Sequence, residues 1–141
     1  MKSTTLIFFY YGMLVLMASM IAPKKDAKYY FQIGERQYEN REWSSAITQY
    51  NYAVRIDNNY MEAYYKRGMA RVKLDSMELG IEDFNKAISL QTSPNGEPLL
   101  QRANARWELK DSVGACSDWN DACEYMSNRA CDLFRKNCSR N

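Results

Sequence analysis

The residues best suited to covalent chemistry in this 141-residue chain are four cysteines, all in its last quarter. They are Cys116, Cys123, Cys131 and Cys138, at successive spacings of seven, eight and seven residues. Seven residues are nearly two turns of an α-helix, so each outer spacing places two cysteines on one helical face. Between the two pairs, Met126-Ser127-Asn128 is typical of a turn, with Asn128 able to cap the following helix.

An antiparallel helical hairpin that turns near residue 127 would bring the cysteines opposite one another in two pairs. A 116–123 bridge would span about 10 Å along one helix, beyond the roughly 7 Å limit between α-carbons. The crossed pairing would require the helices to slide in two directions at once. The sequence therefore predicts Cys116–Cys138 and Cys123–Cys131 bridges, each worth about 2.5 to 3.5 kcal/mol in isolation. The alternatives are free thiols, or a zinc site of a kind that usually has tighter spacing.

Outside the four cysteines, the sequence offers few residues that could support catalysis. The chain has no histidine, which removes the commonest general base and the usual metal ligand. Carboxylate pairs such as Glu82-Asp83, or Asp118 with Asp121, lie at helical spacing and are typical of solvated or ion-paired surface. The net charge is +2, without a basic stripe of interleaved aromatics. We expect no catalytic residue, no cofactor, no metal ion and no nucleic-acid partner, and therefore no enzyme.

The helices that carry these residues belong to an internal repeat with a spacing of 34 residues between Ala27 and Gln91. Large, small, small, aromatic and small residues recur at the same offsets, and a third copy follows one residue late. The three sets are Tyr30, Gly34, Ala46, Tyr50 and Ala53; Tyr64, Gly68, Gly80, Phe84 and Ala87; and Leu99, Ala103, Ala115, Trp119 and Ala122. Each copy holds two helical patterns of about 13 residues, which break at Asn40-Arg41-Glu42, at Asp75-Ser76 and at Asp111-Ser112.

This pattern resembles the tetratricopeptide repeat (TPR), a helix-turn-helix unit of this length, over roughly residues 27–125. One helical hairpin cannot bury its apolar face alone, so the copies must stack. The resemblance implies an all-α TPR solenoid of three helix-turn-helix repeats plus a C-terminal capping helix, preceded by an apolar N-terminal helix. The expected repeats span 27–60, 61–94 and 95–125, and the disulfide-linked capping helix spans 126–141.

The end of the array carries a narrower resemblance. Gly114-Ala115-Cys116-Ser117-Asp118-Trp119, followed by Cys138, is similar to the closing repeat of small exported TPR proteins from bacterial cell envelopes. In those proteins a Gly-Ala-Cys-x-Asp-Trp segment ends the array and a last helix carries a second cysteine. Cys123 and Cys131 add a further pair to that pattern.

The N-terminal residues 1–26 lie outside the repeat. Residues 5–22 are an uncharged apolar run, which predicts a signal peptide or an N-terminal membrane anchor. Cleavage after Ala22 would place Met20 third from the cut and Pro23 just beyond it, so we favour the anchor. Together with the disulfides, this run predicts an exported protein that is periplasmic, or membrane-anchored through residues 5–22 and facing an oxidising compartment.

The TPR resemblance also implies a partner-binding groove. TPR arrays bind partners on a concave face made by positions 2, 5, 9 and 12 of each unit, counted here from 27, 61 and 96. The implied groove residues are Lys28, Phe31, Glu35 and Tyr38, then Glu62, Tyr65, Met69 and Val72, then Glu97, Leu100, Asn104 and Trp107. The chaperone-binding class of TPR grips a carboxylate with Lys and Asn at positions 5 and 9 of its first unit. Phe31 and Glu35 stand there, so that function does not transfer. The alternative is that Phe31, Tyr65 and Trp107 pack on one another or on the terminal segments.

Two smaller patterns accompany the repeat. Where position 7 is Arg (Arg67, Arg102), position 23 is Asp (Asp83, Asp118). This indicates that the two charges pair, within a repeat or across the interface between the second and third, and set the stacking register. Asp75-Ser76-Met77 and Asp111-Ser112-Val113 resemble the Asp-Ser/Thr-aliphatic acceptor for O-glycans in some bacterial envelopes. Ser76 and Ser112 are therefore candidate O-glycosylation sites, although each serine could simply cap the next helix.

We interpret the chain as a non-catalytic protein–protein interaction module, an adaptor or scaffold in the cell envelope. Its partner would be another envelope protein or a peptide segment held on the concave face. The alternatives are a structural subunit permanently integrated in a membrane-associated complex, and a thiol-active protein that uses the cysteine hairpin.

Overall fold

The computed structural model describes residues 25–93, 95–125 and 127–138, and within these ranges it contains seven helices and no strand. In chain order they are α2 (Ala27–Glu39), α3 (Trp43–Ile56), α4 (Met61–Lys73), α5 (Met77–Ser89), α6 (Gly96–Glu108), α7 (Ser112–Glu124) and α8 (Asn128–Cys138). The predicted apolar N-terminal run, residues 5–22, lies outside the described residues. None of the helices that are described is long and apolar enough to cross a membrane.

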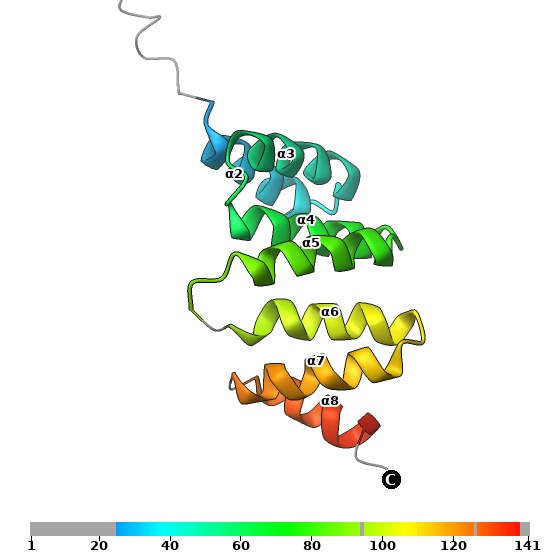
Figure 1. The fold of residues 1–141 in the computed structure, drawn as a ribbon. Coiled ribbons are helices and arrows are strands. Elements are labelled where there is room, and N and C mark those ends of the chain that lie inside the picture. Colours follow the sequence, from blue (N-terminus) through cyan, green and yellow to red (C-terminus); the bar gives the residue numbers. More distant parts are fainter. Residues whose placement is uncertain (1–24, 94, 126, 139–141) are drawn as a thin grey trace, which may run out of the picture.

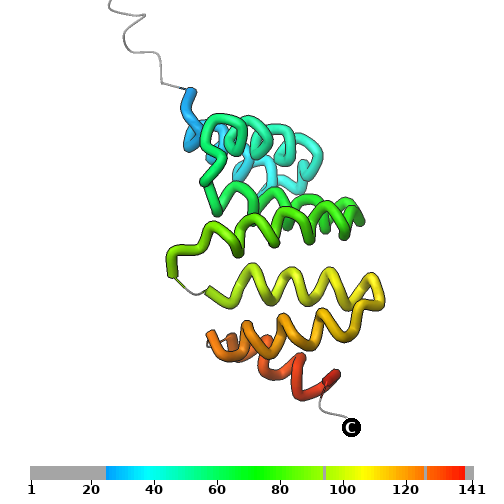
Figure 2. Tube along the Cα trace, viewed as in Figure 1, coloured from blue at the N-terminus to red at the C-terminus, as the bar shows by residue number. Residues whose placement is uncertain are grey.

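The helices form a stack of antiparallel pairs, α2 with α3, α4 with α5 and α6 with α7, and α8 closes the stack beyond α7 (Figure 1). The tube in Figure 2 passes back and forth across the stack, from the blue end at the top to the red end at the bottom. The first helices of successive units also contact one another, α2 with α4 and α4 with α6. We call the surface formed by α2, α4 and α6 the groove face. The expected all-α solenoid of three helical hairpins and a C-terminal helix is confirmed.

The small residues of the repeat allow the two helices of each unit to approach closely. A Cβ atom added to Gly34 would lie 2.6 Å from the Tyr50 ring, and one added to Gly68 would lie 2.8 Å from the Phe84 ring. Each aromatic side chain therefore fills the space that its glycine leaves open. In the third unit Ala103 and Trp119, both nearly fully buried, occupy the same two positions.

The turn inside each unit uses one left-handed residue at the same repeat position. Arg41, Asp75 and Lys110 have φ values of 63°, 59° and 65°. After each one, a backbone N–H bonds back to the carbonyl five residues earlier: Glu42 to Gln37, Ser76 to Arg71 and Asp111 to Arg106, at 2.8 to 3.0 Å. This hydrogen-bond pattern is the Schellman ending of a helix.

The left-handed position corrects two details of the predicted helix starts. Asp75 corresponds to Lys110 and Ser76 to Asp111, so the two Asp-Ser segments are not equivalent. Asp111 is the N-cap of α7 and accepts from Gly114 N at 2.9 Å, whereas Ser76 begins α5 without a side-chain cap hydrogen bond. Of the two serines that could cap a helix, Ser76 occupies the N-cap position without a side-chain hydrogen bond, and Ser112 is already the first residue of α7. At α8, Ser127 Oγ rather than Asn128 accepts from a first-turn N–H, that of Ala130.

Two buried carboxylates connect the helices within the second and third units. Asp83 binds Arg67 at 2.6 Å and Arg71 at 2.8 Å. Asp118 binds Arg102 at 2.6 Å and Arg106 at 2.8 Å. Both aspartate side chains are only 3% exposed. The prediction that arginine and aspartate pair is confirmed, and the pairing lies within a unit.

The same arginines also reach the preceding unit. Arg67 Nη1 donates to Asn51 Oδ1 of α3 at 2.8 Å, and Arg102 Nη1 donates to Asn85 Oδ1 of α5 at 2.6 Å. Asn51 and Asn85 occupy the same repeat position. Each arginine therefore fixes the register between its own unit and the unit before it.

Arg67→Ala would leave the buried Asp83 carboxylate with Arg71 alone, and Asp83→Ala would leave Arg67 and Arg71 without their carboxylate. Each change should therefore destabilise the fold by about 3 kcal/mol. The double variant should lose less than the sum, with a coupling of about 1 to 3 kcal/mol measured by urea unfolding. The control is the exposed α8 pair Arg135 and Asp132, with side chains 71% and 73% exposed. Its coupling should stay below about 0.5 kcal/mol. Additive losses for Arg67 and Asp83 would contradict the proposed role.

Candidate functional site

The first unit presents a hydrogen-bonded cluster on the groove face. The Tyr50 hydroxyl donates to Glu35, and Lys66 Nζ of the next unit binds the other Glu35 oxygen at 2.6 Å. The same ammonium lies 5.6 Å from the centre of the Tyr38 ring. Glu35 thus has two partners already and connects the first two units, which differs from a carboxylate held ready for a partner protein.

Phe31 and Tyr65 stand on the groove face but pack inward along one side. The Phe31 ring centre lies 5.0 Å from that of Tyr60 and 5.8 Å from that of Tyr50. Tyr65 lies 6.0 Å from Phe84, and its hydroxyl donates to Glu97 of the third unit at 3.2 Å. Phe31 and Tyr65 are both half-buried, so each ring offers one edge to solvent while the core fixes the other.

The third unit contributes a pair of tryptophans. The rings of Trp107 and Trp119 lie 5.2 Å apart at 43°. Trp119 is buried, and its indole N–H donates to Asn104 Oδ1 at 3.1 Å. Trp107 is half-buried and covers Trp119 from the groove side. Asn104 is held in one orientation because an indole N–H can only donate.

The twelve predicted groove residues therefore differ in how much surface they offer. Lys28, Glu62 and Glu97 are exposed, and Leu100 is buried. The other eight are half-buried: Phe31, Glu35, Tyr38, Tyr65, Met69, Val72, Asn104 and Trp107. Leu100 is a correction, since at 2% exposure it belongs to the core formed with Leu99 and Ala103 and offers no surface to a partner.

A cleft of about 300 Å³ extends the groove face at its C-terminal end. Asn104, Trp107 and Glu108 of α6 form one wall, and Trp119 of α7 lies at its base. The other wall is α8, through Arg129, Leu133, Lys136 and Asn137. We call this the α6–α8 cleft. The groove predicted from the sequence omitted the α8 wall. Leu133, Lys136 and Asn137 follow Arg129 by four, seven and eight residues, a spacing that places all four on one face of the helix.

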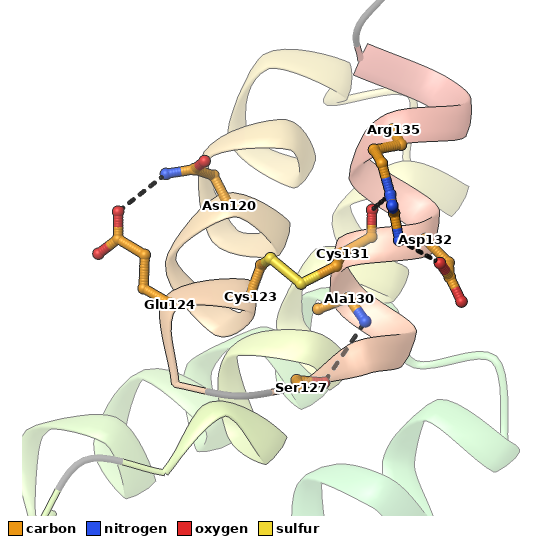
Figure 3. Close-up of a disulfide and its surroundings, with 8 residues drawn as sticks. All are labelled: Asn120, Cys123, Glu124, Ser127, Ala130, Cys131, Asp132 and Arg135. Atoms are coloured by element: carbon orange, nitrogen blue, oxygen red, sulfur yellow. Dashed lines mark hydrogen bonds and ion pairs between the residues drawn. A yellow bond between two sulfur atoms is a disulfide. The ribbon is translucent and has the colours of Figure 1, made fainter.

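The four cysteines lie between α7 and α8 in the two expected pairs. The α-carbons of Cys116 and Cys138 are 5.8 Å apart and those of Cys123 and Cys131 are 4.8 Å apart, and each pair forms a disulfide. Figure 3 shows the inner bridge near the turn between the helices, with Arg135 and Asp132 on the far side of α8. In α8 only Ala130 is buried. Leu133 and Phe134 are partly buried against the core, and the bridges add covalent links to this packing.

The remaining predicted site residues lie where helices begin, Ser76 directly before α5 and Ser112 at the first position of α7. Ser112 is exposed and Ser76 is half-buried. Neither serine lines the α6–α8 cleft, although Ser112 borders Trp107 and Lys110, and the glycosylation of both serines stays a prediction. The described residues contain no group of three or more Cys, Asp or Glu side chains that could hold a metal ion.

Comparison with known sequences matches residues 30–75 to the TPR repeat. The chain is 29% identical over 89 residues to DnaJ homolog subfamily C member 7 of Mus musculus, which is 63% of this chain and 18% of that protein. It is 32% identical over 73 residues to dynein axonemal assembly factor 4 of Rattus norvegicus, 52% of this chain and 16% of that protein. The chain thus spans less than a fifth of these curated relatives.

Solved structures share the fold at low sequence identity. The first TPR of Spaghetti (RPAP3), bound to the HSP90 peptide SRMEEVD, matches with a TM-score of 0.74 at 22% identity, covering 79% of this chain and 90% of that one. PcrH, in complex with the chaperone binding region of PopD, matches with a TM-score of 0.74 at 17% identity, covering 80% and 91%. These likenesses show that the helical stack is a TPR solenoid.

Tyr50, buried on α3 behind the groove face, should make the fold sensitive to alkaline pH. Burial raises the pKa of Tyr50, and its hydrogen bond to Glu35 raises it further. The folded protein therefore keeps a proton that the unfolded chain loses above about pH 10, and this stability declines as the pH rises. Between about pH 10 and 12, the free energy of unfolding of Tyr50→Phe should fall less steeply than that of the parent.

The matched control for this measurement is Tyr52→Phe, because Tyr52 is 43% exposed. Its unfolding free energy, followed by urea titration at each pH, should fall in parallel with that of the parent. A parallel course for Tyr50→Phe as well would show that the buried hydroxyl does not hold its proton.

Peptide mapping without reduction should recover the 116–138 and 123–131 pairs from protein purified without a reductant. The outer bridge closes the longer loop, with separations of 22 and 8 residues. Replacing both outer cysteines by serine should therefore cost about 3.5 kcal/mol, and replacing both inner ones about 2.5 kcal/mol. Appreciable free thiol in that protein, or disulfide exchange with a model substrate, would contradict this and favour thiol chemistry.

Proposed function

We propose that this chain is a non-catalytic adaptor that holds a protein or peptide segment on the groove face. The observation that carries the proposal is the line of half-exposed aromatic rings along that face, Phe31, Tyr65 and Trp107, each fixed from behind by core side chains. Rings that are already immobilised lose little conformational freedom when a partner covers them. Exposed Glu62 and Glu97 add charges that would orient the partner.

The fold comparison supports the same class of function. The solved TPR structures that share this solenoid include complexes with peptide segments, namely the HSP90 peptide and the PopD region. From this we infer that the partner is a protein or peptide segment, and we do not infer which one. The chain's own first unit has Phe31 and Glu35 where the chaperone-binding class has Lys and Asn, and Glu35 already binds Lys66.

The proposed setting is the cell envelope. The apolar residues 5–22 support export or membrane anchoring, and the two disulfides between α7 and α8 support an oxidising compartment. The partner would then be another envelope protein. The pairing of all four cysteines speaks against the thiol-active alternative, because no cysteine is left as an attacking thiolate among the described residues.

The test is affinity purification from crosslinked membranes, followed by mass spectrometry, with charge-reversal variants of matched exposure. Glu62→Lys alters the groove face on α4, and Glu82→Lys makes the same change on α5. Both glutamates are exposed, so neither variant should shift the melting temperature by more than a degree or two. Glu62→Lys should reduce recovery of the principal partner about tenfold, and Glu82→Lys should not.

Equal recovery with both variants would place the partner away from the groove face. Reduced recovery with Glu82→Lys alone would assign binding to the outer layer, formed by α3, α5 and α7. Either result would contradict the proposal.

A further inference from the structure

The α6–α8 cleft differs in charge from the rest of the groove face. Arg129 and Lys136 line it, and Lys110 borders the other side of Trp107. Glu108 is the acidic residue of the cleft. Toward the first unit, in contrast, the exposed groove residues include Glu62 and Glu97. The groove face is therefore acidic along its middle and basic at the end formed by α8.

The cations of this cleft are available for a ligand. Arg67, Arg71, Arg102 and Arg106 are all bound to buried aspartates. Among the described residues, by contrast, no ion pair involves Lys110, Arg129 or Lys136. Arg129 and Lys136 are both exposed and lie seven residues apart on α8, which places them two turns apart on one face.

The interior of the cleft supplies a fixed donor and an apolar contact. Because Asn104 Oδ1 accepts from the Trp119 indole, its Nδ2 is left to donate toward the cleft. Trp107 and Leu133 stand on opposite walls and leave space for an aliphatic or aromatic side chain. Two exposed cations at the rim and an amide donor beside apolar side chains suit a carboxylate next to an apolar group.

We infer that the α6–α8 cleft binds an acidic peptide segment, with a carboxylate between Arg129 and Lys136 and an adjacent apolar side chain against Trp107. This assignment rests on the proposed function, because it names the chemistry of the partner at one end of the same groove. A polyanion such as nucleic acid fits less well, since Glu108 lies in the cleft and Glu97 and Glu62 follow along the face. A short acidic segment avoids those charges.

The test uses the indole signals of full-length protein with both bridges formed. The chain has three tryptophans, so selective ¹⁵N labelling gives three indole N–H signals. Trp107 and Trp119 report the cleft, and Trp43, at the other end of the stack, is an internal control. The probes are capped twelve-residue peptides that repeat Glu-Leu-Glu-Ser, and counterparts with Gln or Lys in place of Glu.

The Glu peptide should shift the Trp107 and Trp119 signals at lower concentration than the Gln peptide, and the Lys peptide should shift neither. Arg129→Glu and Lys136→Glu should each raise the half-saturating concentration about threefold to tenfold. Glu108→Gln should lower it. The matched control is Arg135→Glu, on the far side of α8 and paired with Asp132, which should leave it unchanged (Figure 3).

Several results would overturn the assignment. They are equal or tighter binding of the Lys peptide, no indole shift with any peptide, and an effect of Arg135→Glu as large as that of Arg129→Glu. Equal shifts with anionic lipid vesicles or a single-stranded oligonucleotide would indicate a general anion site instead. If the assignment fails while Glu62→Lys still reduces partner recovery, the adaptor function stands and only the partner chemistry is wrong. If both fail, the adaptor function fails with it.

Discussion

The stack depends on two carboxylates that could not remain in the interior without their arginines. Asp83 and Asp118 each lie between two arginines of their own unit, and one of those arginines reaches an asparagine of the unit before. Desolvating a carboxylate is costly, and a slipped register between the two helices of a unit would separate it from its partners. The apolar contacts between units are largely made by alanines and aromatic rings, which tolerate sliding better than a hydrogen-bonded arginine does. The ion pairs therefore fix the helix register within a unit, and the arginine-to-asparagine hydrogen bonds extend that register to the unit before.

The first unit lacks such an arginine–aspartate cluster, and a different contact connects it to the second unit. Ile33 and Gln49 stand where the later units have arginine and aspartate. The connection between the first and second units comes instead from Glu35, which accepts from Tyr50 and binds Lys66 of α4. This link is more exposed than the aspartate clusters, with side-chain exposures of 28% and 32%. The N-terminal unit is thus attached by weaker electrostatics, and it relies more on the packing of Phe31 against Tyr60.

Much of the fold could be predicted from the sequence because the repeated residues are the ones that pack the helices against each other. A small residue opposite an aromatic residue, sixteen positions apart, fixes one helix pair, and three copies fix the stack. The groove was harder to predict because a repeat position gives the direction of a side chain but not its exposure. Leu100 has the same position as Phe31 and Tyr65, yet the closer packing around Leu99 and Ala103 buries it. The α8 wall was missed because α8 lies outside the repeat, so its register had no second copy to align with.

The attachment of α8 has a consequence for when the groove is complete. The three units can assemble by ordinary packing, whereas α8 adds one fully buried residue, Ala130, with Leu133 and Phe134 partly buried, so the two sulfur bridges strengthen its attachment to α7. A chain with reduced thiols would therefore have a folded array whose last wall is held less firmly. The groove would then form in two steps that proceed at different rates, a fast packing of the helices and a slower oxidation of the cysteines. Any partner that needs the α8 wall would be engaged only after the second stage, so the supply of oxidant sets the moment at which the molecule becomes competent.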